Sequence, residues 1–159
     1  MGIELCHSDK FQIQEVGIFL LGYSAHHNIS ALSFLKDTVS QHGSWKVQEI
    51  LAMAFDNHCK IIGYNVALPL IKEWLNSDCA NVRRAVSEGL RIWTSRPYFK
   101  DNPHREDPSE YVRKSVGNAL RDISKKYPEL ISKELSLWNL SSKEIIQVYK
   151  LANKFLDLT

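Results

Sequence analysis

The sequence predicts an all-α protein made of antiparallel helix pairs. Three observations support this fold class. No stretch of the 159 residues shows the regular apolar–polar alternation of a β-strand, and only 7 glycines interrupt the chain. In addition, one amphipathic helical pattern occurs twice, first from Asp78 to Trp93 and again from Asp107 to Ile123.

The two copies of this pattern place apolar or small residues at equivalent positions, 30 residues apart. These residues are Val82, Ala85, Val86, Gly89, Leu90 and Trp93 in the first copy, and Val112, Ser115, Val116, Ala119, Leu120 and Ile123 in the second. Their spacing is that of one buried helical face. A helical motif that repeats every 30 to 47 residues or so is typical of HEAT-like and armadillo α-solenoids. We therefore expect a single HEAT-like repeat domain over residues 1–159.

Six further helices are expected around this repeat. They run from about Asp9 to Tyr23, from Ile29 to Val39, from Ser44 through Ala54, from Ile61 to Leu75, from Pro128 to about Trp138, and from Ile145 to Phe155. Gly22 and the polar residues after it are expected to end the first of them. Ser44 is a suitable N-cap for the third helix, and Ser141 with Glu144 forms a candidate capping box for the last.

The segment between the two repeat helices is too short for a complete helix pair. Only thirteen residues, from Thr94 to Glu106, separate them, and two of these are Pro97 and Pro103. We therefore expect one shortened repeat around residues 94–107.

Composition and motifs exclude several classes of protein. The chain carries 20 Lys and Arg against 18 Asp and Glu, and its three cysteines have no CxxC spacing. It contains no Gly-rich phosphate loop, HExxH, GxSxG or carboxylate-rich metal loop, so we expect neither a cofactor nor a metal. The N-terminal segment is polar, and no apolar run approaches the roughly 18 residues that a membrane span requires. A cytoplasmic protein is expected.

The third expected helix carries a candidate site. With Val47, Ile50 and Leu51 in the core, Trp45 and Glu49 project together from the opposite side, one turn apart. A large aromatic side chain in water beside a carboxylate suggests a binding surface. The alternative is that Trp45 packs on a neighbouring helix and that Glu49 is an ordinary surface acid.

The outer sides of the two repeat helices are polar and mostly basic. Arg84, Glu88 and Arg91 lie on that side of the first helix, and Lys114, Asn118, Arg121 and Asp122 on that side of the second. In a solenoid, equivalent faces of successive helices line one concave surface, which here would suit phosphates and a nucleobase or sugar. The alternative is that these charges form ion pairs between repeats.

Two segments, NVRRAVSEGLR and DPSEYVRKSVGNALRDISKKYPEL, resemble the HEAT-like DNA alkylation-repair glycosylases, the AlkD/AlkC group. The resemblance covers roughly residues 44 to 156. It implies a helical solenoid that binds alkylated duplex DNA and excises N3- and N7-alkylated purines.

The resemblance also implies roles for particular residues. In the AlkD branch, an aromatic residue and an acid one turn apart contact the deoxyribose of the lesion, and Trp45 and Glu49 have this spacing, with Glu in place of Asp. An arginine about 35 residues later, here Arg84 or Arg83, holds the DNA backbone. Asn118 stands where that branch has a second tryptophan, and Asn118 with Asp122 is similar to the AlkC branch.

Two functions follow from these residues, and the sequence leaves both open. In the first, the protein is an alkylpurine glycosylase with Glu49 and Asp122 as catalytic carboxylates and Trp45 as an aromatic wall. Its DNA contacts would be Arg84, Arg91, Lys114, Asn118 and Arg121. In the second, it is a non-catalytic HEAT-like module for a protein partner or an unusual DNA structure, or a homodimer that uses apolar residues such as Tyr98 and Phe99.

Overall fold

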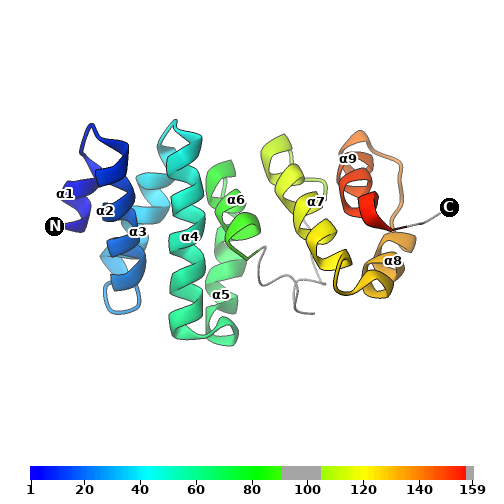
Figure 1. Ribbon diagram of the computed structural model, residues 1–159, viewed down its shortest axis with the longest axis horizontal. Coiled ribbons are helices and arrows are strands. Elements are labelled where there is room, and N and C mark those ends of the chain that lie inside the picture. The colour runs from blue at the N-terminus through cyan, green and yellow to red at the C-terminus, as the bar shows by residue number, and fades with distance from the viewer. Residues whose placement is uncertain (91–104, 157–159) are drawn as a thin grey trace. The chain divides into compact units, whose positions relative to one another are not determined.

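The computed structural model describes residues 1–90 and 105–156, in which every regular element is a helix and no strand occurs (Figure 1). The α-helices are α1 Gly2–Cys6, α2 Phe11–Ser24, α3 Ile29–Asp37, α4 Trp45–Ile62, α5 Tyr64–Leu75, α6 Ala80–Gly89, α7 Glu110–Ser124, α8 Pro128–Ser136 and α9 Lys143–Ala152. Two short 3-10 helices are η1 Val39–Gln41 and η4 Asn153–Phe155. The predicted all-α class is confirmed.

The chain consists of two compact units, residues 1–89 and residues 90–159. The N-terminal unit contains α1 to α6, and the C-terminal unit contains α7 to α9. Each unit is described by itself below. A single domain over residues 1–159 stays a prediction.

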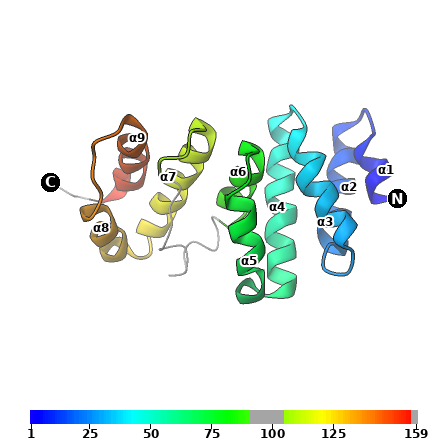
Figure 2. The same ribbon diagram turned by 180° about the vertical axis from the view of Figure 1, so that it is seen from behind.

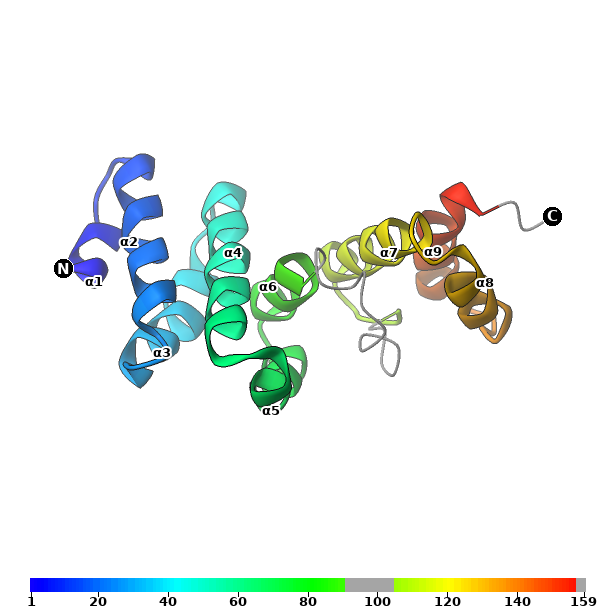
Figure 3. The same ribbon diagram turned by 60° about the horizontal axis from the view of Figure 1, so that its bottom comes forward.

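The N-terminal unit is a row of helix pairs. Helix α2 packs on α4, and α4 packs on α6, while α3 and α5 lie on one side of that row (Figures 2 and 3). The core between these layers is apolar. Leu35, Leu51, Phe55 and Trp74 are fully buried in it, and the rings of Phe55 and Trp74 lie 4.4 Å apart. This core holds α4 and α6, which carry the candidate site of this unit, in fixed positions.

The C-terminal unit is organised around α7. This helix packs against both α8 and α9, and its inner face buries Val112 and Val116 completely. Gly117 allows α9 to approach closely, because a Cβ atom at this position would lie 2.7 Å from the Cβ atom of Leu151. The polar side of α7 remains at the surface.

The two repeat helices share a detailed contact as well as a sequence pattern. Arg83 Nη1 donates hydrogen bonds to the carbonyls of Ser77 (2.7 Å) and Asp78 (2.9 Å), just before α6. Thirty residues later, Arg113 Nη1 donates in the same way to the carbonyls of Asp107 (2.6 Å) and Pro108 (3.0 Å), just before α7. The 30-residue spacing therefore reflects one local structure that occurs twice, with an arginine closing the turn before each helix.

One predicted helix boundary is wrong. The sequence predicts a helix from Ile61, but α4 continues through Ile62 and α5 begins only at Tyr64. Gly63 separates them with a φ of 87°, in the region that glycine adopts without steric cost. The break is therefore set by backbone conformation rather than by the apolar pattern.

Two further local predictions are corrected. Gly22 does not end the first long helix: it lies inside α2, which runs to Ser24, and faces Ala54 of α4. The cap of α9 is Ser142 rather than Ser141, since the Ser142 side chain accepts a hydrogen bond from the backbone N–H of Ile145 (3.1 Å).

Several expectations fall on residues 91–104 and thus outside the described residues. One is the shortened repeat around residues 94–107, of which only residues 105–107 are described. The others are the DNA contact assigned to Arg91 and the apolar residues Tyr98 and Phe99. Within the described ranges, 1–90 and 105–156, none of the helices combines the length and the apolar character that crossing a membrane requires.

Candidate nucleic-acid interface

Helix α4 presents an aromatic side chain and a carboxylate side by side at its N-terminal end. Trp45 is its first residue and is 61% exposed, and Glu49, one turn later, has 42% of its side chain exposed. The core side of the same turn is formed by Val47 and Leu51, which are 2% and 0% exposed. The alternative interpretation of the sequence requires Trp45 to be buried against α3. Its exposure shows that it is not.

Arg84 of α6 reaches the same carboxylate. Its Nη2 atom forms an ion pair with Oε1 of Glu49, and only 7% of the Arg84 side chain is exposed. The sequence predicts Arg84 on the outer side of its helix, but α6 packs against α4, so the side of α6 that faces Glu49 is buried between them. Burying a guanidinium is costly unless it is paired, and Glu49 supplies a partner. This is the ion pair between repeats that the sequence offered as the alternative.

The two neighbouring arginines make different contacts. Arg83 is committed to the carbonyls of Ser77 and Asp78 and thereby to the turn before α6. Arg84 contacts Glu49 across the α4–α6 interface. Of the predicted site residues in the N-terminal unit, Arg84 and Glu49 are therefore in contact, and Trp45 lies one turn from Glu49.

A buried amide network supports the start of α4. Gln48 is 5% exposed, and its Nε2 atom lies 3.2, 3.1 and 2.6 Å from the carbonyl oxygens of Val39, Ser40 and His42. Asn81 of α6 donates to the same Ser40 carbonyl at 2.7 Å. One peptide group thus links the helix that carries Glu49 to the helix that carries Arg84. Gln48 is not among the predicted site residues, although a polar residue at a core position of α4 is a signal for this role.

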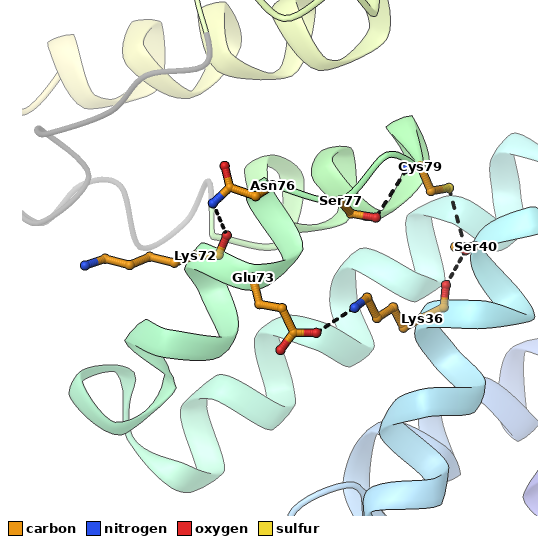
Figure 4. Close-up of polar contacts among 7 residues, drawn as sticks. All are labelled: Lys36, Ser40, Lys72, Glu73, Asn76, Ser77 and Cys79. Atoms are coloured by element: carbon orange, nitrogen blue, oxygen red, sulfur yellow. Dashed lines mark hydrogen bonds and ion pairs between the residues drawn. The ribbon is translucent and has the colours of Figure 1, made fainter.

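The side chain of Ser40 extends this network, as Figure 4 shows. The Ser40 hydroxyl donates to the carbonyl of Lys36 and accepts a hydrogen bond from the thiol of Cys79 at 3.7 Å. Lys36 in turn forms an ion pair of 2.6 Å with Glu73 of α5. Polar contacts therefore join α3, α4, α5 and α6 behind the candidate site.

The site residues of the C-terminal unit lie on α7. Asp122 Oδ1 is 3.5 Å from Arg121 Nη2 and 3.3 Å from Lys125 Nζ, and 29% of the Asp122 side chain is exposed. Lys114 is more exposed and pairs with Glu110 at 2.9 Å. Asn118 lies on the same helix and is half-buried. Cations and a carboxylate are therefore close together at the polar side of α7.

The described geometry thus gathers the predicted residues in two groups, one in each unit. Trp45, Glu49 and Arg84 form the first group, and Lys114, Asn118, Arg121 and Asp122 form the second. One concave surface that joins both groups stays a prediction, as do the roles of the individual residues.

Helix pairs and a helical motif that recurs after 30 residues are typical of HEAT-like helical repeat proteins. Within that class, the chain belongs to the DNA alkylation repair enzyme family, because the model of this family matches residues 2–136. The resemblance to the AlkD/AlkC group is thereby confirmed.

Solved structures agree with this assignment. The crystal structure of AlkD2 from Streptococcus mutans has 55% sequence identity and a TM-score of 0.90, and the match covers 98% of this chain and 79% of that one. The AlkC alkylpurine DNA glycosylase of Pseudomonas fluorescens, solved with DNA containing an abasic site analog, has 23% identity and a TM-score of 0.54, over 91% of this chain and 47% of that one. The latter likeness concerns the fold alone. Both support the predicted HEAT-like solenoid class.

One further relative shares only a short segment with this chain. The protein YhaZ of Bacillus subtilis (strain 168) is 40% identical over 78 residues, which are only 22% of YhaZ. The shared segment is therefore a small part of that protein.

Proposed function

We propose that this chain binds DNA and acts in the repair of alkylated purines, with the lesion at Trp45 and Glu49. The observation that carries the proposal is an indole left 61% exposed one turn from a carboxylate that a buried arginine holds in place. A large exposed aromatic side chain beside an oriented charge suits a nucleobase or sugar. Membership of the DNA alkylation repair enzyme family supports the same function.

The phosphate contacts are proposed for the C-terminal unit. Residues 90–159 contain 13 of the 20 Lys and Arg and 9 of the 18 Asp and Glu, so their net charge is +4. The other 7 basic and 9 acidic residues give the N-terminal unit a net charge of −2. Neutralising phosphates requires clustered cations. Lys114 and Arg121 therefore serve as backbone contacts and Asn118 as a polar contact.

The proposed chemistry uses the positive charge of the lesion. An N3- or N7-alkylated purine is already cationic, so its glycosidic bond breaks without a strong general acid and leaves an oxocarbenium-like sugar. A carboxylate held beside that sugar lowers the barrier electrostatically, and the Trp45 ring keeps water from the sugar face that it covers. Glu49 is the proposed carboxylate in the N-terminal unit, and Asp122 is the candidate in the C-terminal unit.

The test is release of methylated bases from alkylated duplex DNA by the full chain. We expect release by the wild type and at least a 100-fold loss in Glu49→Gln, whose DNA affinity is retained. Asp122→Asn is assayed alongside to find out whether the second carboxylate takes part. Glu73→Gln is the matched control, since Glu73 also pairs with a cation but lies on α5. Undiminished release by Glu49→Gln would remove Glu49 from the mechanism.

A second candidate function, DNA binding without excision, is favoured by one observation. The Glu49 carboxylate already pairs with Arg84, and a nearby guanidinium offsets the stabilisation that a carboxylate gives to a developing cation. Salt-sensitive DNA binding without base release by the wild type would support this second function and refute the first.

A further inference from the structure

Asn81 and Arg84 lie one turn apart on the same side of α6. Asn81 Nδ2 donates a hydrogen bond of 2.7 Å to the carbonyl of Ser40 in η1, and Arg84 Nη2 forms the ion pair with Glu49 of α4. The first turn of α6 is thus fixed to η1, and its second turn is fixed to α4. Because both side chains belong to one helix, a movement of α6 that breaks the first contact also disturbs the second.

The Ser40 carbonyl is an acceptor that α4 and α6 share. Gln48 Nε2 of α4 lies 3.1 Å from this oxygen, and Asn81 Nδ2 of α6 lies 2.7 Å from it. A carbonyl oxygen has two lone pairs, so the two amides use its whole accepting capacity. Gln48 is 5% exposed and is therefore held in place by the core. The position of α6 relative to α4 is thus defined at this one peptide group.

The helical repeat itself does not require this arrangement. Thirty residues after Asn81 and Arg84, the equivalent positions of the second repeat helix are occupied by Tyr111 and Lys114. Tyr111 is 55% exposed, and Lys114 pairs with Glu110 of its own helix. The two residues through which α6 reaches η1 and α4 are therefore specific to the first copy. This difference favours a role in the candidate site over a role in the repeat.

We infer that Asn81 is a positioning residue for the carboxylate of Glu49. The inference rests on the proposed function, in which Glu49 lies beside the sugar of the lesion. Arg84 binds one carboxylate oxygen, Oε1, so the position of α6 determines how the carboxylate is turned. Asn81 fixes that position through Ser40 and acts through Arg84 rather than on the substrate. A displacement of about 1 Å at a reacting group can cost on the order of 100-fold in rate.

The test compares two asparagines that make the same kind of hydrogen bond. Asn81→Ala removes the donor to the Ser40 carbonyl. Asn81→Asp removes the same donor with almost no change in size, and the two variants are expected to behave alike. Asn76→Ala is the matched control, since Asn76 Nδ2 also donates to a carbonyl, that of Lys72 at 2.8 Å, but lies at the end of α5 (Figure 4).

The first measurement needs neither DNA nor excision. The coupling free energy between Glu49 and Arg84 comes from urea denaturation of Glu49→Gln, Arg84→Gln and the double variant, and it is determined again in the Asn81→Ala background. We expect the coupling to fall by about half or more in that background and to stay unchanged with Asn76→Ala. Unchanged coupling in the Asn81→Ala background, or an equal fall with Asn76→Ala, overturns the inference.

The second measurement is single-turnover release of methylated bases from alkylated duplex DNA. Asn81→Ala is expected to release them at least about 10-fold more slowly with unchanged DNA affinity, because the carboxylate is displaced rather than lost. In a Glu49→Gln background Asn81→Ala should add no further loss, since no carboxylate is then left to position. A loss of equal size in both backgrounds would show that Asn81 acts independently of Glu49, and it overturns the inference.

Failure of the proposed function and failure of this inference give different results. A wild type that releases no bases refutes excision, and the coupling between Glu49 and Arg84 then decides alone whether Asn81 positions the pair. A wild type that releases bases no faster than Asn81→Ala leaves the proposed function intact and overturns the inference.

Discussion

Glu49 lies between a buried cation and an exposed aromatic ring. Its carboxylate pairs with Arg84, whose side chain is 7% exposed, yet 42% of the Glu49 side chain still meets solvent. The residue therefore has a structural role, because it balances a charge inside the protein. It has an accessible surface as well, which is what the proposed role in DNA repair requires. Any experiment on Glu49 must separate these two roles.

Loss of the Glu49 charge is expected to lower the stability of the protein. Glu49→Gln leaves the buried Arg84 without this carboxylate, and we expect the free energy of unfolding to fall by about 1–3 kcal/mol. Urea denaturation measures the change. Glu73→Gln, which removes an exposed partner of Lys36, is expected to cost about 0–1 kcal/mol. Equal losses in the two variants would show that burial of Arg84 adds nothing to the pair.

The three cysteines are expected to differ in reactivity. Burial raises the pKa of the Cys59 thiol to about 12, with a further increase from the charge of Asp56. Burial also raises the pKa of the Cys79 thiol, but hydrogen bonds with the backbone at Val82 and Asn81 and with the side chains of Ser40 and Gln41 together outweigh it and hold that pKa below the ordinary value. Burial alone raises the pKa of Cys6.

Because the thiolate is the nucleophile, alkylation of the native protein should follow these pKa values. Iodoacetamide at pH 7.5 is expected to modify Cys79 first, Cys6 more slowly and Cys59 only after unfolding. Mass spectrometry of peptides at successive times measures the order. Urea-unfolded protein is the control, and there all three should react at similar rates. Modification of Cys59 ahead of Cys79 in the native state would contradict the expectation.

At the scale of helices, the close approach of α2 to α4 restricts which residues can lie between them. Gly22 lies inside α2, where glycine is less favourable than alanine by about 1 kcal/mol. A Cβ atom at this position would lie 2.7 Å from the Cβ atom and 2.9 Å from the Cα atom of Ala54 in α4. The separation of α2 and α4 therefore depends on the missing side chain.

Gly22→Ala is expected to destabilise the protein by about 1–2 kcal/mol, because the cost of separating α2 from α4 exceeds the gain in helix propensity. Urea denaturation measures the change. Gly43→Ala is the control, since a Cβ atom at Gly43 would meet nothing within 4 Å and its φ is not positive. That substitution should leave stability nearly unchanged. A stabilised Gly22→Ala variant would mean that the two helices separate at little cost.

At the scale of the whole molecule, charge is distributed unevenly. The N-terminal unit has a net charge of −2 and the C-terminal unit a net charge of +4, although the whole chain carries only +2. The net charge of the whole chain therefore does not reflect the basic character of the C-terminal unit. If DNA is bound, long-range attraction should come mainly from residues 90–159.

The salt dependence of DNA binding should show whether the phosphate contacts lie in the C-terminal unit. We expect Lys114→Gln and Arg121→Gln each to weaken DNA binding and to reduce the slope of log affinity against log salt concentration by about 0.9. Fluorescence anisotropy with labelled duplex DNA at several salt concentrations measures the slope. Lys60→Gln, an exposed change in the N-terminal unit, is the control and should leave the slope unchanged. Equal effects of Lys60→Gln and Lys114→Gln would place phosphate contacts in both units.

The sequence alone was sufficient to predict the helical class, the repeat and the family. A helical face that recurs after 30 residues is a local property of the chain, and Arg83 and Arg113, at equivalent positions of its two copies, make equivalent hydrogen bonds. The outward position of Trp45 and Glu49 was predictable for the same reason, since helical periodicity fixes which side of α4 faces the core. Family membership rests on the sequence as well.

Only the tertiary structure decided where Arg84 and Gly22 lie. Periodicity distinguishes the core side of a helix from its other sides, but it does not show which of those other sides meets a neighbouring helix. Arg84 is buried because α6 packs against α4, and Gly22 is required because α2 approaches Ala54. Which side of α2 remains in water was equally unpredictable, because apolar residues lie on two opposite sides of this helix: Ile18 and Leu21 are buried, whereas Val16 and Tyr23 are exposed.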